Sequence, residues 1–372
     1  MSNISRELLI DLTKTDQDEV PSKTIRLLKA VRETRMKAGE LTTECDVSRS
    51  TVYDILAPLV DAGLIDQTND GSLLTGAGAI VLRLFMRLDT RERSALARLP
   101  ISSSRRDLLD LLATRPATKS ELNDWCQDLS YSAIRLATDQ FHEKGLIHLN
   151  KSRQYELTND GRTAIECERR LLIQIETILD NISFFRHTTI SCASFPVHAI
   201  DETWLVTGPK EYPRAERNEY VSFLKSLDPT ETDQICLFSA YYDHEMAELY
   251  LDRFLDEGVQ IDIISPQSAL YNVPTARPKA RLVRNALKAP NLSWQLCSES
   301  IPVGCTLIDR DYVVFYPRQP LGAVSESGTL FSEDQEVIEW ARELFAAYMS
   351  KSKPPRQQIL RTIWSLGFDL PP

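Results

Sequence analysis

The chain has 372 residues, of which 42% are hydrophobic and 26% are charged, with 13 glycines and 19 prolines. This composition excludes collagen-like, low-complexity and largely disordered chains, and it predicts two or three folded domains. The net charge of −10 argues at first against nucleic acid as a partner, because phosphate contacts need Lys and Arg. The charge is uneven, since residues 1–90 carry −3, residues 91–180 carry 0 and residues 181–372 carry −7.

Membrane insertion and secretion are not expected. The longest uncharged apolar stretch, residues 73–82, is far shorter than the roughly 20 residues of a bilayer span. The N-terminus shows no basic cluster followed by an apolar stretch, so no signal peptide is predicted. None of the seven cysteines forms a Cys-x-x-Cys pair or has a His at zinc-ligand spacing. We therefore expect a cytoplasmic protein with buried, reduced thiols, no cofactor and no metal.

A repeat of about 80 residues organises the first half of the chain. In the first copy, residues 25–31 and 41–45 predict two helices, and Ser48 is a good N-cap for a third helix that runs to about residue 62. Gly63 is expected to end that helix, and residues 64–74 to form a hairpin with its tip at 68–71. The second copy predicts helices at 104–114, 121–126 and 130–143, then a hairpin at 146–157 with its tip at 150–154.

This order of elements is that of a winged helix. The motif Val-Ser-Arg-Ser-Thr-Val-Tyr at 47–53, followed by Leu-x-x-Ala-Gly-Leu-Ile at 59–65, resembles archaeal winged-helix transcription regulators, and the resemblance covers about the first 165 residues. It implies two tandem winged-helix domains, at residues 1–95 and 96–165, that bind double-stranded promoter DNA.

The resemblance also implies which residues would contact DNA. The N-terminal part of each third helix would face the major groove and its phosphates, and the second hairpin would lie on the backbone or the minor groove. The implied residues are Ser48, Arg49, Ser50, Thr51 and Tyr53 in the first copy, Ser130, Tyr131, Ser132 and Arg135 in the second copy, and Lys151 and Arg153 on the second hairpin. Arg32, Arg35 and Lys37 could add phosphate contacts or form a solvated face.

A linking segment is expected at residues 166–187. Its apolar residues follow alternating spacings of four and three, which is typical of a helix with a narrow seam. They are Leu171, Ile175, Ile178, Ile182 and Phe185. Two interpretations stay open: the seam forms a homodimer, or it packs onto the chain's own winged helix.

Residues 188–372 predict an α/β domain with a mostly parallel sheet. Strands are expected at 235–238, 259–264, 292–297, 305–308 and 312–316, and helices at 244–258, 277–289 and 336–349. A short docking helix is expected at 359–366. The whole chain is thus a multi-domain protein of the α+β and α/β classes.

The two last strands flank Asp309-Arg310-Asp311, and this order resembles the phospholipase-D-like regulatory domain of some archaeal winged-helix regulators related to the TrmB group. In the catalytic family a His-x-Lys motif precedes this hairpin, whereas residues 302–309 contain neither side chain. The resemblance therefore implies a regulatory domain that is not an enzyme.

An unknown small-molecule or protein effector is expected at the carboxyl ends of the parallel strands. The candidate residues there are Tyr241, Tyr242, His244, Ser265, Gln267, Ser298 and Arg284. The same residues can also be loop and capping residues. Cys297 and Cys305 could form a redox switch if their strands are neighbours, or they are inert thiols.

The sequence therefore predicts a transcription regulator, with a homodimer that reads two half-sites and an acidic C-terminal domain that senses a signal. The alternative is a protein-interaction module, in which the winged helices dock on the transcription or replication machinery.

Overall fold

The computed structural model describes residues 3–13, 22–100, 102–126, 129–200, 203–207, 215–239, 244–268, 288–316 and 328–354. Its contacts divide the chain into two compact units. The first unit comprises Met1–Leu74 and Val81–Leu179, and the second comprises Thr75–Ile80 and Asp180–Pro372. No helix among the described residues is long and apolar enough to cross a bilayer.

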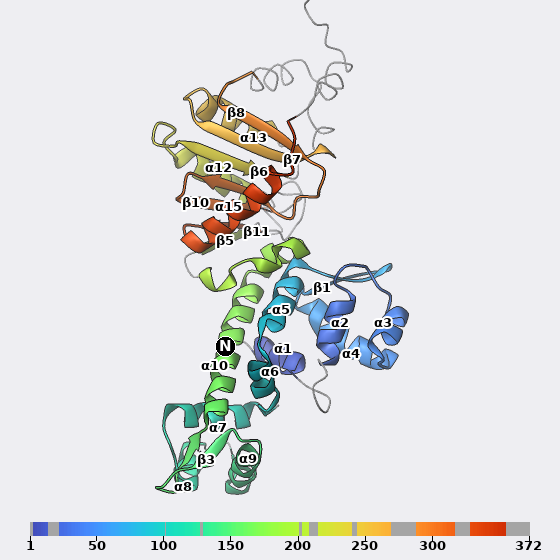
Figure 1. The fold of residues 1–372 in the computed structure, drawn as a ribbon, viewed down its shortest axis with the longest axis vertical. Helices are drawn as coiled ribbons and strands as arrows, with labels where there is room; N and C mark the ends of the chain where they lie inside the picture. Colours follow the sequence, from blue (N-terminus) through green and yellow to red (C-terminus); the bar gives the residue numbers. More distant parts are fainter. Residues whose placement is uncertain are drawn as a thin grey trace, which may run out of the picture. The chain divides into compact units, whose positions relative to one another are not determined.

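The first unit contains the predicted repeat, preceded by α1 (Asn3–Thr13). Each copy consists of three helices and a two-stranded antiparallel hairpin, as the sequence predicted (Figure 1). The first copy is α2 (Lys23–Ala30), α3 (Ala38–Cys45), α4 (Arg49–Asp61), β1 (Ile65–Thr68) and β2 (Gly71–Leu74). The second copy is α7 (Ser103–Thr114), α8 (Lys119–Trp125), α9 (Tyr131–Glu143), β3 (Ile147–Leu149) and β4 (Tyr155–Leu157).

The third helix of each copy begins and ends in the same way. Ser48 and Ser130 are the N-caps, and each hydroxyl accepts a hydrogen bond of 3.2 Å from the amide three residues on. Gly63 and Gly145 follow the helices with φ of +72° and +70°, a left-handed conformation that glycine adopts without a steric penalty. The sequence predicted both features for the first copy, and their recurrence in the second copy fixes where α4 and α9 start and stop.

The hairpin of each copy has a third, one-residue partner that the sequence did not reveal. Met36 pairs with Ser72 in the first copy, and Ala117 pairs with Tyr155 in the second. In both pairs the two residues exchange backbone hydrogen bonds, with N–O distances of 2.7–3.1 Å. The segment before α3 or α8 is thereby fastened to the hairpin.

The repeat extends into a fourth helix. Thr75 and Thr158 follow the two hairpins, and their hydroxyls accept hydrogen bonds from the amides of Gly78 and Gly161. The helices that start there are α5 (Gly76–Arg87), which α6 (Thr90–Ala97) follows, and α10 (Asn159–Asp180). The predicted linking segment is therefore the second half of α10 together with the short α11 (Ile182–Phe185).

Helix α10 buries its apolar seam within the chain. Leu171, Leu172, Ile175 and Ile178 are at most 3% exposed. Of the two interpretations of the seam, packing onto the chain's own helices describes these residues. The homodimer stays a prediction, and Ile182 of the seam is half-buried in the single chain.

A buried ion pair joins α10 to the second copy. The guanidinium of Arg106 on α7 contacts the carboxylate of Glu168, and their side chains are only 3% and 5% exposed. Arg106 Nε also donates to the carbonyl oxygen of Pro100 at 2.6 Å. Burial lowers the pKa of Arg106 to about 10, so the guanidinium is still charged at neutral pH.

The second unit is built on one seven-stranded sheet in the order β5-β11-β10-β9-β6-β7-β8. Only the pairs β6–β7 and β7–β8 are parallel, and the other described pairs are antiparallel. The strands are β5 (Thr203–Thr207), β6 (Gln234–Phe238), β7 (Gln260–Pro266), β8 (Leu292–Cys297), β9 (Gly304–Ile308), β10 (Tyr312–Tyr316) and β11 (Gly328–Ser332).

The prediction of a mostly parallel sheet is therefore wrong. The sequence interpretation missed β11, which pairs antiparallel with β10, and β5, which pairs antiparallel with β11. It also treated the hairpin β9–β10 as an addition to a parallel sheet, whereas β9 pairs antiparallel with the central strand β6. Strands joined by a short turn are antiparallel neighbours, so β10 runs opposite to β9, and the antiparallel pairing continues through β11 to β5.

Helices cover both faces of this sheet. On one face, Ile235 and Leu237 of β6 share a core with α12 (Ala215–Ser226) and with α13 (His244–Tyr250) and its π-helical continuation Leu251–Leu255. On the other face, Phe238 stacks edge-on against Phe345 of α15 (Gln335–Met349). The predicted helix at 277–289 lies outside the described residues except for its last two positions, which are not helical, and the predicted helix at 359–366 lies wholly outside them.

The second unit takes part of its core from the first half of the chain. Ala77 and Ile80, at the start of α5, are at most 1% exposed, and their segment Thr75–Ile80 clusters with the second unit. At Gly76 an added Cβ would lie 2.7 Å from the carbonyl oxygen of Phe185 and against the hydroxyl of Thr188. Glycine is therefore required at this close approach.

Candidate nucleic-acid interface

The N-terminal turn of α4 presents the predicted contact residues to solvent. Ser48, Arg49, Ser50 and Tyr53 are exposed, and Thr51 is half-buried. The hydroxyl of Ser48 lies 2.8 Å from those of both Ser50 and Thr51. The Arg49 guanidinium lies 5.8 Å from the centre of the Tyr53 ring and donates to its hydroxyl at 3.4 Å. The structure thus brings all five residues to the start of one helix.

The start of α9 repeats this arrangement. Ser130, Tyr131, Ser132 and Arg135 are exposed, and the hydroxyls of Ser130 and Ser132 lie 3.0 Å apart. Tyr131 is 56% exposed, which is unusual for so large an aromatic side chain. A helix end that exposes hydroxyls, an aromatic ring and a guanidinium has the groups that contact DNA phosphates and base edges.

Two positively charged residues, Lys151 and Arg153, lie in a hydrogen-bonded turn at the tip of the second hairpin. The side-chain oxygen of Asn150 accepts hydrogen bonds from the amides of Ser152 and Gln154 at 2.9 and 3.0 Å. Arg153 adopts a left-handed conformation with φ of +60°. Lys151 and Arg153 are both exposed, as a contact to phosphate requires.

The first hairpin is acidic, and Arg35 has a different role from the one considered for it. Its guanidinium donates to the carboxylate of Asp66 at 2.8 Å, to Thr68 Oγ1 at 2.9 Å and to the carbonyl oxygen of Gly71 at 3.0 Å. Arg35 therefore clamps the two strands of its own hairpin. No local pattern indicates this contact, because Arg35 and Asp66 are 31 residues apart.

The predicted effector residues are only partly brought together. Parallel pairing of β7 and β8 puts Ser265 opposite Leu296, so Ser265, Gln267 and Ser298 lie at one edge of the sheet. Ser265 is buried, and its hydroxyl accepts a hydrogen bond of 2.7 Å from Trp294 Nε1. The other candidates, Tyr241, Tyr242, Arg284 and the side chain of His244, lie outside the described residues.

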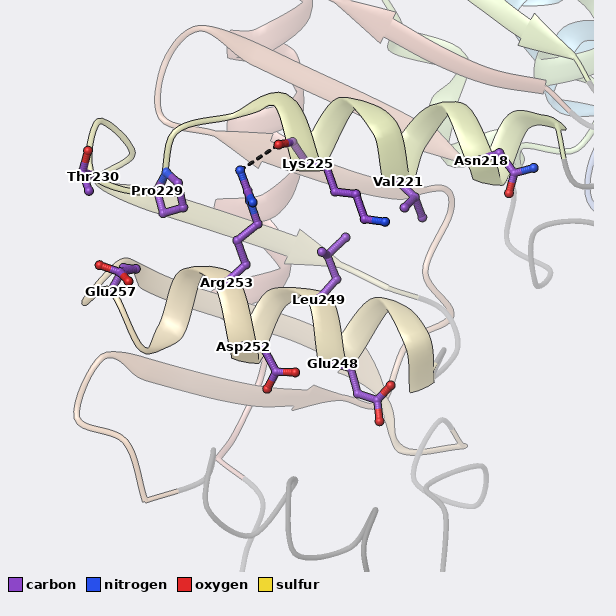
Figure 2. Close-up of a pocket in the computed structure, with 10 residues that line it drawn as sticks. All are labelled: Asn218, Val221, Lys225, Pro229, Thr230, Glu248, Leu249, Asp252, Arg253 and Glu257. Atoms are coloured by element: carbon purple, nitrogen blue, oxygen red, sulfur yellow. Dashed lines mark hydrogen bonds between the residues drawn. The ribbon is translucent and has the colours of Figure 1, made fainter.

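A groove in the second unit lies elsewhere, between α12 and α13 (Figure 2). Its volume is about 800 Å³. Lys225, Glu248 and Asp252 are among its lining residues, whereas Ser265, Gln267 and Ser298 are not. The Arg253 guanidinium donates to the carbonyl oxygens of Lys225 and Leu227 at 2.7 and 2.6 Å. Arg253 Nη2 thus caps the C-terminal end of α12, whereas the buried Arg253 Nε has no hydrogen-bond partner among the described residues.

Cys297 and Cys305 are buried thiols rather than a redox pair. Cys297 on β8 and Cys305 on β9 are separated by the strands β7 and β6, which puts them roughly 14 Å apart, about twice the Cα distance that a disulfide spans. The redox hypothesis for this pair is therefore wrong. Burial raises the pKa of the Cys236 thiol to about 12 and that of Cys167 to about 11. No group of three metal-ligating side chains occurs among the described residues.

Two segments of the chain match known protein families. Residues 217–351 match the middle domain of the methanogenesis regulatory protein FilR1. Residues 21–96 match the HVO_A0261 N-terminal domain. A comparison with the curated proteins finds no match. The family similarity therefore covers the first helix–hairpin copy and most of the second unit.

The likeness to solved structures is weak. TrmBL2, described as an archaeal chromatin protein with a novel mode of DNA binding, is 14% identical, with 74% of this chain and 98% of that chain covered at a TM-score of 0.32. NucT from Helicobacter pylori is 14% identical over 41% of this chain and 98% of its own, at 0.33. Nuc of Salmonella typhimurium, a phospholipase D family member, is 12% identical over 42% and 99%, at 0.30. TM-scores this low do not establish a shared fold.

Proposed function

We propose that the chain is a transcription regulator that binds double-stranded promoter DNA through two tandem winged-helix domains. The observation that carries this proposal is the paired, exposed N-terminal turn of α4 and α9, each of which begins at a capping serine and presents an Arg and a Tyr. Such a helix in the major groove, with a hairpin beside it, is the winged-helix mode of DNA contact. Because the proposed partner is DNA, we also propose that the protein is cytoplasmic.

The second unit would be the regulatory part of the protein. Its match to the middle domain of a regulatory protein supports this assignment. Effector binding would shift the population of states in which the two winged helices engage DNA together. Within the second unit, we propose two places for such an effector, the sheet edge with Gln267 and Ser298 and the groove between α12 and α13.

We propose no phosphodiesterase activity for this unit. In the stretch 302–309, Gly304 is buried, and an added Cβ would collide with the ring of Tyr316. Residues 302–309 also contain neither the His nor the Lys of the catalytic motif. Hydrolysis of a generic phosphodiester by the pure protein would contradict the proposal.

Salt-dependent DNA binding tests the proposed function. The full chain is titrated onto a fluorescent fragment of its own upstream region and onto an unrelated fragment of equal length, at several salt concentrations. We expect a preference of about a hundredfold or more for the first fragment. The double variant Arg49→Gln/Arg153→Gln should bind more weakly, and the slope of log K against log salt should become shallower by about 1.8, or about 0.9 for each lost phosphate contact.

The matched control is Arg310→Gln/Lys351→Gln, which removes two exposed cations from the second unit. Its slope should equal that of the unaltered chain. If both double variants change the slope equally, attraction to DNA is a general charge effect and the assigned contacts are wrong. If the unaltered chain binds both fragments equally and weakly, the protein-docking alternative gains, and capture of transcription or replication proteins becomes the next experiment.

A further inference from the structure

Three cavities among the described residues differ in their charge. The groove between α12 and α13 mixes Lys225 and Arg253 with three carboxylates. A cavity of about 380 Å³ beside α1, α2 and α4 is lined by three carboxylates and a single lysine. A third cavity, of about 880 Å³, lies in the first unit and is lined by four cations and one carboxylate. Only the third has the charge to hold an anion.

This third cavity, here called the α6–α7–α9 cavity, lies where the two helix–hairpin copies join. It is bounded by the end of α6, the first turn of α7 and the last turn of α9, with one residue from α1. Its lining residues are Ile10, Leu96, Ala97, Arg98, Leu99, Pro100, Ser102, Arg105, Arg106, Gln140, Phe141, Glu143 and Lys144. Its volume falls within the range of about 300–1,000 Å³ that is usual for small-molecule sites.

Two of the four cations are paired with carboxylates, and the other two have neutral partners. Arg98 is paired with Asp160 at 3.0 Å, and Arg106 contacts Glu168. In contrast, Arg105 donates to the amide oxygen of Gln140 at 2.6 Å, and Lys144 donates to the carbonyl oxygen of Arg98 at 3.2 Å. Neither contact neutralises a positive charge, so both cations can still gain from an anion.

The first turn of α7 adds to the positive electrostatic potential of this cavity. This helix has twelve residues and begins at Ser102, whose side chain makes no capping hydrogen bond in the described structure. The N-terminal end of a helix carries a partial positive charge and unpaired amides, which favour a bound anion. Leu96, Leu99 and Phe141 complete the lining with apolar carbon. The cavity therefore offers a cationic side and an apolar side.

We propose that the α6–α7–α9 cavity binds a small organic anion, namely a carboxylate with an apolar tail. Its carboxylate pairs with Arg105 and Lys144, and its tail packs on Leu96, Leu99 and Phe141. The ligand bridges α7 and α9 of the second copy and the end of α6. It therefore acts on how the second copy is held against α6, and this part of the proposal rests on the proposed DNA-binding function.

Calorimetric titration of the full chain with decanoate tests the binding itself. We expect saturable binding, and at least tenfold weaker binding of decan-1-ol, which has the same tail without the charge. Arg105→Gln and Lys144→Gln should each weaken decanoate binding about tenfold or more. Ala97→Phe should block binding by filling the cavity while it keeps every charge. The control Arg310→Gln/Lys351→Gln should bind decanoate as the unaltered chain does.

Absence of saturable binding up to millimolar decanoate would overturn the proposal. So would binding that Arg105→Gln, Lys144→Gln and Ala97→Phe leave unchanged, because the carboxylate would then sit elsewhere. If Arg105→Gln lowers DNA affinity and the salt slope while decanoate does not bind, Arg105 contacts DNA phosphate and the cavity is not an effector site.

A second titration separates this site from the proposed function. Decanoate should change the affinity for the upstream DNA fragment at least fivefold in the unaltered chain and should not change it in Ala97→Phe. If decanoate binds but no DNA fragment does, the cavity assignment stands and the proposed function fails. If DNA binds specifically and decanoate does not bind, the reverse holds.

Discussion

The two helix–hairpin copies agree in backbone structure and differ in surface chemistry. The N-cap serine, the left-handed glycine after the third helix and the threonine after the hairpin recur in both. The exposed side chains of the two hairpins do not recur. The first hairpin carries Asp66 and is clamped by Arg35, whereas the second presents Lys151 and Arg153.

The third helices differ in a more specific way. In α4, Arg49 precedes Tyr53 by four residues, whereas in α9 Tyr131 precedes Arg135 by the same spacing. The order of the cation and the ring is thus reversed. The guanidinium therefore lies one helical turn further along in α9 than in α4, where it would meet different groups of the DNA. The two copies therefore share a scaffold and are expected to contact DNA differently.

The largest effect is expected at the ion pair that ties the second copy to α10. Glu168→Gln leaves Arg106 as an uncompensated buried charge and should lower the free energy of unfolding by about 3–5 kcal/mol. Calorimetric unfolding of the full chain measures this loss of unfolding free energy. The control Arg169→Gln removes an exposed pair with Asp110 and should cost less than about 1 kcal/mol. Equal costs would mean that the buried pair contributes no more than a surface contact.

Reversing the Arg–Tyr order in one helix tests the difference between the copies. In the double variant Arg49→Tyr/Tyr53→Arg, α4 takes the order of α9 and the total charge is unchanged. We expect relative affinities for different base pairs under α4 to change by about 1–3 kcal/mol, the size of one Arg–base contact. Competition binding with a library of operator variants measures this. Unchanged base preference would show that neither position reads a base.

The left-handed glycines should behave alike. Gly63→Ala and Gly145→Ala place a Cβ in a left-handed conformation and should each destabilise by about 1–2 kcal/mol. Gly39 lies inside α3 with open space around an added Cβ. Gly39→Ala should therefore be neutral or stabilise by less than about 1 kcal/mol. Thermal midpoints of the three variants compare these effects, and a stabilised Gly145→Ala would contradict the assigned end of α9.

The sequence could predict these backbone features because they are local. Ser48 lies three residues from the amide that it caps, and Gly63 ends the helix that it follows. Contacts between distant residues escaped prediction, as with Arg35 on the first hairpin and Arg106 with Glu168. The mostly parallel sheet was predicted from one βαβ unit, and nothing local to β11 revealed its antiparallel partners.

The smallest effects are expected at the N-caps. Ser48→Ala and Ser130→Ala each remove one hydrogen bond to a helix amide and should each cost about 1 kcal/mol. We expect the two variants to lose equal free energy of unfolding, since the hydrogen bond is 3.2 Å long in both copies. Urea denaturation measures both variants. Losses that differ by more than about 1 kcal/mol would show that one serine has a further role.

The contribution of Thr75–Ile80 to the second unit limits how this protein can be divided. A fragment that begins at residue 180 would lack Ala77 and Ile80, which are buried in the intact chain. Such a fragment should expose apolar surface and aggregate when it is expressed alone. Recombination at a single junction before residue 180 would therefore not join a complete second unit to another DNA-binding domain. A successful exchange would have to carry the start of α5 with it, so the two halves are expected to be inherited together.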